Sequence, residues 1–307
     1  MQLINSTIVD VSIKEQLTES LVSGIIDRHV ETEVDWSNIK YLGVLGIDEI
    51  ALKKGHKNYV TVITCRHQGK NRLLATIQSR EKHKIKAFLK NIPIALKATI
   101  EAICTDMYDG YVNAAREIFK KKTIIVIDRF HVAKLYRKDL DKYRKKILNE
   151  LKGFLSANEY EKLKGSMNIL RKGNECSSKK EKIIVQELFS HSPELAEAYR
   201  LGLKLTQIFN THMNKSEAIT KINGWVKEVK ISRLTVFKSF IKTLKKYKGS
   251  IANYFIDRNS SGFVEGLNNK VKILKRRCYG IFNIKHLFQR LHLDISGYAI
   301  FIGKSAC

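Results

Sequence analysis

Apolar and polar residues change their spacing twice along the chain. Between residues 41 and 128, short apolar runs rich in Val and Ile alternate with turn-forming residues, which predicts β-strands. We expect strands over 41–52, 59–66, 72–78, 100–106 and 123–128, turns over 53–58 and 68–71, and helices over 82–90 and 111–119. The order βββαβαβ indicates an α/β fold, with a three-strand meander followed by parallel crossovers in one mixed sheet.

The flanking segments have helical spacing. Leu17, Leu21, Ile25 and Ile26 recur as on one helix face, which fits half of a helix-turn-helix or an amphipathic helix packed on the next domain. Residues beyond 132 are mostly helical and basic. We therefore expect a short N-terminal helical segment, a core built from two separated stretches, and a large basic helical insertion before the last part of the core. These parts are 1–40, 41–132 with 256–300, and 133–255.

A further helix is predicted over 260–277, with Ser260 or Ser261 as its N-cap. Positions three, four and seven apart share a helix face, so its apolar and polar residues separate. The expected buried face is Val264, Leu267, Val271 and Leu274, and the expected open face is Glu265, Asn269, Lys272 and Arg276.

Charge points to a polyanionic partner. The 307 residues contain 56 Lys and Arg against 30 Asp and Glu, a net charge of +26, with basic runs over 134–152, 227–248 and 270–277. Nucleic acid is the first candidate, although an AT-rich genome also favours Lys. The apolar content of 44% excludes disorder of the whole chain. Five scattered cysteines, none in a C-x-x-C pair, argue against a disulfide framework or a Cys-rich zinc site and fit a reducing cytoplasm. No apolar run is long enough to span a membrane.

Three acids stand in or after the predicted strands. Asp48 lies inside the first, Asp106 ends the fourth, and Asp128 ends the fifth. An Asp at a strand end often caps the next turn, and that alternative weighs most for Asp128 and least for Asp48. In this topology the first and fourth strands are neighbours, so their acids approach each other. Carboxylates that close repel unless a cation lies between them, and Mg²⁺ prefers oxygen ligands.

Glu265 is a candidate third acid. It lies near the start of the helix predicted over 260–277. Five Lys and Arg follow it within 268–277, which suits an acid beside a phosphate backbone. A solvated helix with ordinary charge pairing is the alternative.

Four blocks of sequence occur in order between residues 41 and 295. They are GIDEIALKKGH at 46–56, TDMYDGY at 105–111, DRFHV at 128–132, and EGLNNKVKILKRRCYG at 265–280. Together they resemble the ISL3 family of bacterial insertion-sequence transposases. The resemblance implies an RNase H-like core whose catalytic and metal-binding triad is Asp48, Asp106 and Glu265, with Mg²⁺ or Mn²⁺ as cofactor. It implies cleavage of DNA at the element's ends and transfer of the 3′-hydroxyl to target DNA.

The same resemblance suggests supporting roles for other residues. Asp128, His131 and Asn269 are candidates to support the triad. The candidate DNA contacts are Lys270, Lys272, Lys275, Arg276 and Arg277. The implied partners are the DNA of the element's ends and of the target, with a homo-oligomer on DNA, no membrane, and a place in the cytoplasm at the nucleoid.

The sequence departs from the family pattern at its beginning. Family members usually start with a Cys-rich zinc-binding segment and helix-turn-helix units, and residues 1–40 contain no Cys. A truncated, non-transposing DNA-binding remnant is therefore the alternative function. A structure-selective RNase H-like nuclease would share the triad but not the four blocks.

Overall fold

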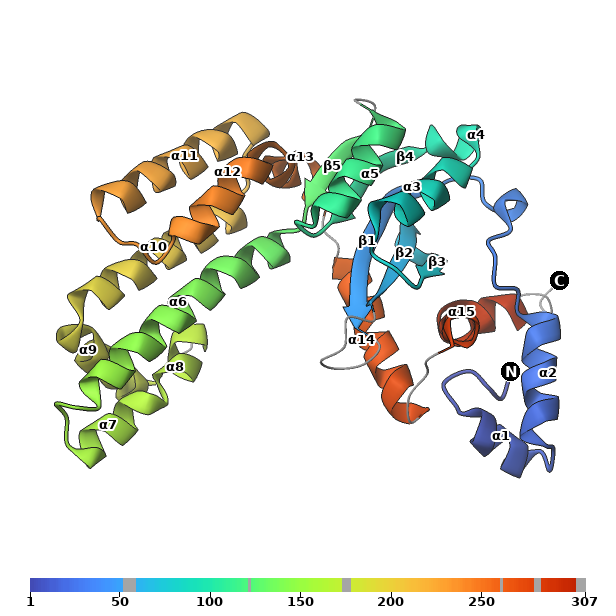
Figure 1. The fold of residues 1–307 in the computed structure, drawn as a ribbon, viewed down its shortest axis with the longest axis horizontal. Coiled ribbons are helices and arrows are strands. Elements are labelled where there is room, and N and C mark those ends of the chain that lie inside the picture. The colour runs from blue at the N-terminus through green and yellow to red at the C-terminus, as the bar shows by residue number, and fades with distance from the viewer. Residues whose placement is uncertain (52–58, 121–122, 173–177, 260–261, 279–282, 302–307) are drawn as a thin grey trace. The chain divides into compact units, whose positions relative to one another are not determined.

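The computed structural model describes residues 1–51, 59–120, 123–172, 178–259, 262–278 and 283–301. The chain divides into two compact units, Met1–Asp128 with Arg258–Cys307, and Arg129–Asp257 (Figure 1). We call them the sheet unit and the helical unit and describe each by itself. The helical unit spans nearly the same residues as the insertion expected over 133–255, whereas the N-terminal helices belong to the sheet unit. The turn expected over 53–58 lies outside the described residues.

One five-stranded mixed sheet forms the centre of the sheet unit. Its strands are β1 (Gly43–Ala51), β2 (Tyr59–His67), β3 (Lys70–Ile77), β4 (Ile100–Thr105) and β5 (Ile124–Ile127). Their order is β3-β2-β1-β4-β5, with β2 antiparallel to both its neighbours and β1, β4 and β5 mutually parallel. The predicted strand order along the chain and the pairing of the first and fourth strands are confirmed. This mixed α/β architecture is compatible with an RNase H-like core.

Helices cover both faces of this sheet. The sheet unit contains α1 (Ile8–Lys14), α2 (Glu19–His29), the 3₁₀ turn η1 (Trp36–Asn38), α3 (Lys82–Asn91), α4 (Ile94–Lys97), α5 (Asp109–Phe119), α14 (Gly262–Arg277) and α15 (Ile284–Phe301). Successive residues of a strand point to opposite faces. The hydroxyls of Thr61 on β2 and Tyr111 on α5 share a hydrogen bond of 2.8 Å, whereas Val60 and Val62 pack with α14. Therefore α5 and α14 lie on opposite faces.

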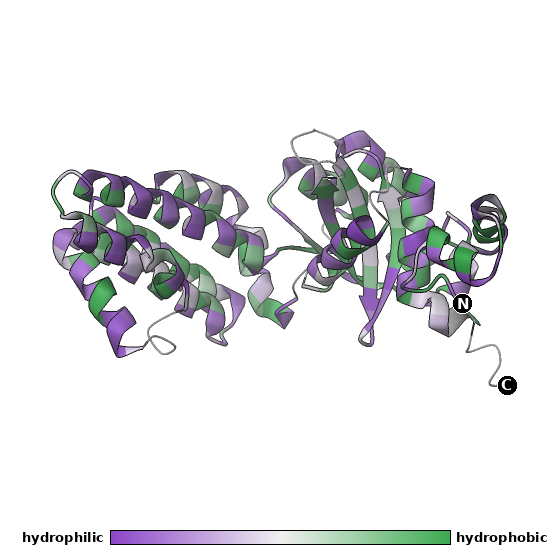
Figure 2. Ribbon diagram, turned by 90° about the horizontal axis from the view of Figure 1, so that it is seen from below, coloured by the Kyte–Doolittle hydropathy of each residue, from purple (hydrophilic) through white to green (hydrophobic). Residues whose placement is uncertain are grey.

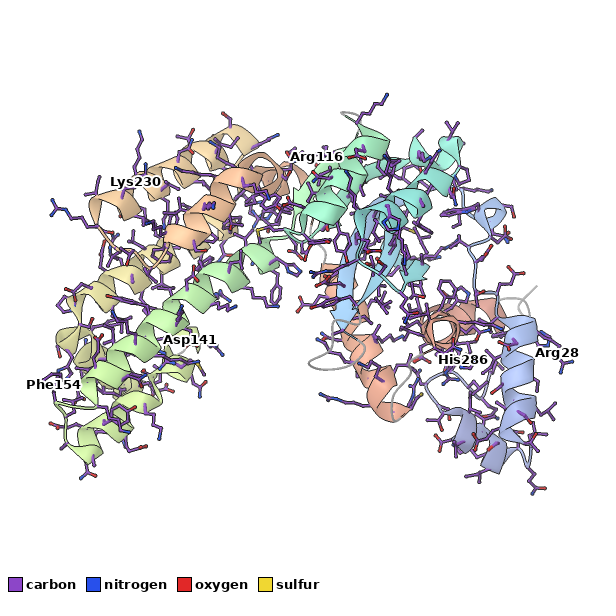
Figure 3. The ribbon with its side chains drawn as sticks, viewed as in Figure 1. Arg28, Arg116, Asp141, Phe154, Lys230 and His286 are labelled. Carbon is purple, nitrogen blue, oxygen red and sulfur yellow. The ribbon has the colours of Figure 1, made fainter. Side chains whose placement is uncertain are left out.

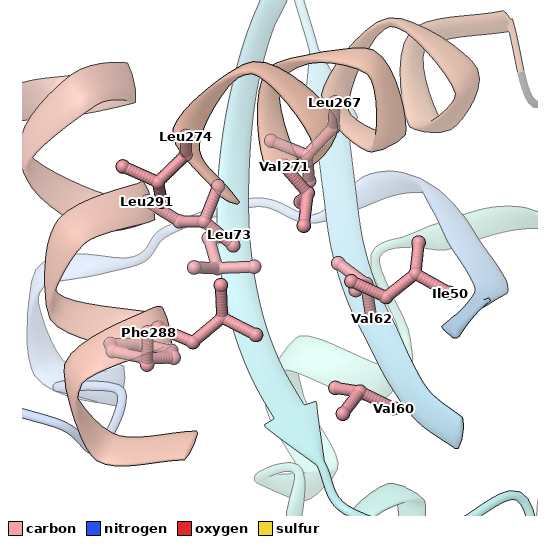
Figure 4. Packing of buried hydrophobic residues seen from close by; sticks show 10 residues of the cluster. Ile50, Val60, Val62, Leu73, Leu267, Val271, Leu274, Phe288 and Leu291 are labelled. Carbon is pink, nitrogen blue, oxygen red and sulfur yellow. The ribbon is translucent and has the colours of Figure 1, made fainter. Parts of the chain in front are cut away.

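The face under α14 is held by apolar packing. Figure 4 shows Val60, Val62, Ile50 and Leu73 of the strands beneath the two C-terminal helices. The helix residues of this cluster are Leu267, Val271, Leu274, Leu287, Phe288 and Leu291. Each fully buried side chain of this size contributes about 1.5–3 kcal/mol. The predicted apolar face of α14 is confirmed, because Val264, Leu267, Val271 and Leu274 are all buried.

Gly46 allows α14 to approach β1 closely. A Cβ at Gly46 would lie 2.1 Å from Cγ2 of Val264 and 3.0 Å from the ring of Phe263. No side chain fits in that space without displacing the helix or its residues. The glycine therefore sets the distance between the strand and the start of α14.

The N-terminal helices pack on α15. Ile26 and Val30 form an apolar cluster with Leu293, and Gln289 Nε2 donates to Asp27 Oδ1 at 2.9 Å. This contact matches the packed-helix interpretation of the N-terminal segment. Of the four apolar residues that the spacing selected, Ile26 is buried, whereas Leu17, Leu21 and Ile25 are exposed, and the other buried residue of α2 is Val22.

The helical unit consists of eight described helices. They are α6 (Arg129–Leu151), α7 (Ala157–Lys164), α8 (Ser166–Lys172), α9 (Lys179–His191), α10 (Pro193–Asn210), α11 (Lys215–Ile231), α12 (Lys238–Ala252) and α13 (Tyr254–Asp257). Ser156, Ser178 and Asn214 each begin a helix with a reciprocal capping box, which explains these helix starts.

Aromatic residues and one internal ion pair order this unit. Trp225 packs edge-on against Phe237 and Phe240, and its indole N–H donates to the Leu201 carbonyl at 2.8 Å. The buried Arg144 is neutralised by Asp141, which is labelled on α6 in Figure 3, at 2.8 Å. Hydrophilic and hydrophobic residues alternate along these helices in Figure 2, as expected for helices with one buried stripe.

Candidate active site

Three acids occupy equivalent positions on the three parallel strands. Ile47 of β1 pairs with Thr105 of β4, which pairs with Ile127 of β5. The next residue along each strand is Asp48, Asp106 and Asp128, in that order across the sheet. Adjacent strands lie about 4.8 Å apart, so the backbone of Asp106 lies between those of the other two acids. The sheet therefore places the three acids side by side, with Asp48 inside β1 and the other two directly after β4 and β5.

Asp48 is buried, with 7% of its surface exposed, and both of its carboxylate oxygens accept hydrogen bonds. Oδ1 accepts from the backbone N–H of Glu49 at 2.8 Å, and Oδ2 accepts from Nδ2 of Asn268 on α14 at 2.5 Å. Hydrogen bonds from N–H donors stabilise an ionised carboxylate. A buried negative charge without such partners would be very costly, so these contacts explain how an acid is tolerated inside a strand.

Asp106 follows directly after β4 and shapes the turn into α5. Its Oδ1 accepts from the backbone N–H of Tyr108 at 2.9 Å, which is the local turn that Asp side chains commonly form. Burial raises the pKa of the Tyr111 hydroxyl, and the negative charges of Glu49, Asp106 and Asp48 raise it further, while its hydrogen bond with Thr61 opposes the shift. The negative charges of three acids, two on β1 and one directly after β4, thus act on the Tyr111 hydroxyl.

Glu49 belongs to the opposite face of β1 from Asp48. Burial raises the pKa of Glu49, the positive charge of Arg80 lowers it, and the negative charge of Asp106 raises it. Arg80 lies 3.5 Å from the Glu49 carboxylate and stacks over the rings of Tyr59 and Tyr108 at 4.5 and 4.9 Å. This arginine connects the start of α5 to β1 on the face that α14 does not cover.

Helix α14 runs along β1 in the same direction. Gly46 lies against Val264, Asp48 bonds to Asn268, and the Ala51 carbonyl accepts from Nζ of Lys275 at 3.1 Å. Two strand residues rise about 6.6 Å and four helix residues about 6 Å, so the first two contacts stay in step. The helix is therefore aligned with the strand over most of its length.

Glu265 lies in the first turn of this helix and is half-buried. It precedes Asn268 by three positions, and such residues are neighbours with their Cβ atoms about 5–6 Å apart. The side chain that bonds Asp48 is thus one helical turn from Glu265. The structure brings the turn that carries the expected third acid to the same face of β1 as the first. The N-cap candidates Ser260 and Ser261 lie outside the described residues.

The structure places the predicted supporting residues differently. Asp128 is buried, and its backbone N–H donates to the Thr105 carbonyl at 3.1 Å. His131 belongs to the helical unit, at the start of α6. Asn269 is exposed, and its side chain accepts from Nζ of Lys272 at 3.1 Å. The amide that reaches Asp48 is Asn268, which the sequence analysis passed over. Its spacing of four from Val264 and three from Val271 was the available signal for a buried position.

The predicted DNA-contacting residues fall into two groups. Lys270 Nζ donates to the Asp294 carbonyl of α15, and Arg277 pairs with the Asp294 carboxylate at 2.6 Å. Lys272 and Arg276 are exposed on the open face of α14. Lys275, half-buried, binds the end of β1 as described above. The open face of α14 therefore offers Lys272 and Arg276 to a phosphate backbone, while Lys270 and Arg277 tie α14 to α15.

Clusters of metal-binding side chains and membrane-spanning helices are both absent from the part of the chain that the structure describes. Within these parts of the chain, no group of three or more His, Cys, Asp and Glu side chains is arranged to hold a metal ion. Among the same residues, no helix is long and apolar enough to cross a membrane.

Comparison with known proteins identifies the family. The family model of ISL3-type DDE transposases, described as "Transposase", matches residues 45–291. The chain is 27% identical over 268 residues to "Transposase for insertion sequence element IS1001" of Bordetella parapertussis, covering 87% of this chain and 64% of that protein. It is 22% identical over 297 residues to "Transposase for insertion sequence element IS1557" of Mycobacterium tuberculosis, covering 90% of this chain and 66% of that protein. The chain thus spans just under two thirds of the length of these relatives, and it belongs to the ISL3 family of insertion-sequence transposases.

Proposed function

We propose that this chain cleaves DNA at the ends of an insertion sequence and joins the freed 3′-hydroxyl to target DNA. The triad for this reaction is Asp48, Asp106 and Glu265. The observation that carries the proposal is the hydrogen bond between Asp48 and Asn268, because it fixes the helix bearing Glu265 over the strand bearing Asp48. Residues 217 positions apart in sequence, Asp48 and Glu265, then act at one edge of the sheet.

The residues at this edge suit a divalent cation. Asp48 and Asp106 follow each other across neighbouring parallel strands, and Mg²⁺ is commonly held by one or two carboxylates together with substrate phosphates. The amide Oδ1 of Asn268 is buried there and has no hydrogen-bond partner among the described residues. An uncharged oxygen on the amide that contacts the Asp48 carboxylate fits the oxygen ligands that Mg²⁺ and Mn²⁺ take. A bound Mg²⁺ or Mn²⁺ would supply Lewis-acid activation of the attacking oxygen.

The chain's own side chains have distinct tasks in this proposal. Asp48, held by two N–H donors, presents a fixed negative charge, and Asp106 adds a second charge from the next strand. Glu265 completes the set from the half-buried first turn of α14. Holding the reacting groups in fixed geometry accounts for a large part of the acceleration of such reactions.

Basic residues would hold the DNA backbone. On α14 these are the exposed Lys272 and Arg276. In the helical unit, a groove of about 990 Å³ lies between α6 and the start of α12. Five lysines line it, namely Lys142, Lys145, Lys146, Lys238 and Lys242, together with Asp139 and Glu150. Contacts of this kind fix register on DNA without reading its sequence.

The test uses purified full-length chain and a DNA duplex that carries the ends of the insertion element. With Mg²⁺, the wild-type protein should nick the duplex, and Asp48→Asn and Asp106→Asn should not. Affinity for the duplex should stay the same or rise in both variants, because each removes a negative charge near phosphate. Glu101→Gln is the matched control, since Glu101 is an exposed acid on β4, the strand that Asp106 follows. In the described contacts its carboxylate accepts a hydrogen bond only from the Tyr41 hydroxyl.

The possible outcomes separate a transposase from a DNA-binding remnant and from a structure-selective nuclease. Nicking by Asp48→Asn at the wild-type rate would refute the triad. Tight binding of the ends without nicking in either Mg²⁺ or Mn²⁺ would identify a DNA-binding remnant. Equal cutting of duplexes with and without the element's ends would favour a structure-selective nuclease.

A further inference from the structure

Asn268 has an unusual place among the polar side chains of the sheet unit. It is buried, with 7% of its surface exposed, on the apolar face of α14. Its nearest face-sharing residues are Val264 and Val271, both buried. Burying an amide costs about 1–3 kcal/mol for each group left without a hydrogen bond, and a hydrogen bond to Asp48 offsets this cost for the N–H alone. The amide is therefore expected to have a task other than packing.

Half of this amide is satisfied and half is not. Nδ2 donates to Asp48 Oδ2 at 2.5 Å, while Oδ1 is buried without a hydrogen-bond partner among the described residues. The reverse orientation would turn the amide oxygen toward an ionised carboxylate, which is repulsive, so the orientation is fixed by Asp48. The oxygen is left over because the N–H must face the acid.

We propose that Asn268 is a positioning residue of the divalent-cation site, and that its Oδ1 is an additional oxygen donor to that site. Its N–H holds the Asp48 carboxylate in one orientation, and the orphaned oxygen supplies a neutral donor that a cation would satisfy. This inference rests on the proposed function, because it assumes that Asp48 binds the cation. It explains why a polar residue interrupts the apolar face of α14 at the one position opposite Asp48.

The first experiment measures cation binding directly. Mn²⁺ is titrated into the full-length protein by calorimetry, in the absence of DNA, for the wild type and Asn268→Ala. Loss of a side chain that orients a metal-binding group typically weakens metal affinity about 10–100-fold, and we expect a loss in that range. Asn91→Ala is the matched control, since Asn91 is an exposed asparagine at the end of α3 and should leave Mn²⁺ affinity unchanged.

The second experiment separates a role at the cation from simple packing. Asn268→Asp keeps the size of the side chain but sets a second carboxylate against Asp48. Like charges repel unless a cation lies between them, so this variant should melt well below wild type without Mn²⁺. Mn²⁺ should then raise its Tm by more than it raises that of wild type. Asn91→Asp adds the same charge at an exposed position and should show no such gain.

The outcomes distinguish this inference from the proposed function. If Asp48→Asn loses Mn²⁺ binding but Asn268→Ala binds as wild type does, the inference is wrong and the acid site stands. An Asn268→Asp variant whose loss of Tm is the same with and without Mn²⁺ would also refute the inference. If Asp48→Asn binds Mn²⁺ as tightly as wild type, both proposals fail together.

Discussion

Replacing Gly46 by Ala tests the close packing of α14 against β1. The arrangement of the site depends on this packing. The new Cβ would lie 2.1 Å from Val264 Cγ2, where ordinary contacts begin near 3.4 Å, so the helix must move outward by about 1.3 Å unless Val264 rotates. A β-branched residue in a helix has one strongly preferred rotamer, so rotation is also unfavourable. Overpacking of this kind costs about 1–3 kcal/mol, and we expect that loss of unfolding free energy.

The magnitude can be checked with a double-mutant cycle. Val264→Ala alone removes two buried methyl groups, worth about 1.6 kcal/mol at about 0.8 kcal/mol each. In the double variant the shortened residue 264 makes room for the new Cβ. Residues in direct contact show coupling energies of about 0.5–3 kcal/mol. The double variant should therefore lose at least about 0.5 kcal/mol less than the sum of the two single variants.

Urea melts of the four proteins give these free energies, and Gly266→Ala supplies the control. Gly266 is an exposed residue of α14 with no atom within 4 Å of an added Cβ. The same substitution there should stabilise the protein by about 0.8–1 kcal/mol through helix propensity. A Gly46→Ala variant as stable as wild type, or strictly additive losses in the cycle, would show that α14 does not lie on Gly46.

The same substitution should also slow DNA cleavage. An outward shift of about 1.3 Å would lengthen the 2.5 Å contact between Asn268 and Asp48 to about 3.8 Å, which is beyond hydrogen-bonding distance. Misplacement of reacting groups by about 1 Å can cost about 100-fold in rate. Val264→Ala should restore part of this loss in the double variant.

Three further predictions concern stability, salt and pH. Leu267→Ala should lower the unfolding free energy by about 2–5 kcal/mol, while Lys272→Ala should change it by less than about 0.5 kcal/mol and weaken DNA binding, and melts with binding isotherms check both. DNA affinity should fall steeply with salt, and Lys272→Ala should reduce the log–log slope by about one, so an unchanged slope would contradict a phosphate contact. Burial raises the pKa of Glu49, so this carboxyl's stabilising contribution is present at low pH and is lost as the pH rises through the raised value. The Tm of Glu49→Gln should therefore gain on wild type as the pH rises from about 4.5, the ordinary value for Glu, through the raised pKa, and a difference that does not change with pH would refute this.

The sheet was predictable because its signals are local. Apolar runs bounded by Gly and Asn fixed the strands to within a few residues, and the rule for parallel crossovers set β4 beside β1. The positions of Asp48 and Asp106 on neighbouring strands followed from these two facts. The face of α14 was also predictable, because the helical period separates Val264, Leu267 and Val271 from Lys272 without reference to any other element.

Contacts between distant segments were not predictable in the same way. The helical period marks Asn268 rather than Asn269 for the buried face, but only the approach of β1 gives Asn268 its partner Asp48. Lys270 and Arg277 looked like DNA contacts because their partner, Asp294, belongs to a later helix. Leu21 and Ile25 suggested a buried face on α2 together with Ile26, but with α15 packed on this helix the buried residues are Ile26 and Val22.

The place of α14 in the chain bears on how the protein is made. Gly262 follows Ile77, the end of β3, by 185 residues, which a ribosome adding about 5–20 residues per second needs roughly 10–40 s to synthesise. During that interval Val60, Val62 and Leu73 are not yet covered by α14, so the emerging sheet exposes an apolar surface to chaperones and proteases. A product terminated early carries Asp48 and Asp106 but no Glu265. Under the proposed function, incomplete copies are both unable to cut the chromosome and exposed to degradation.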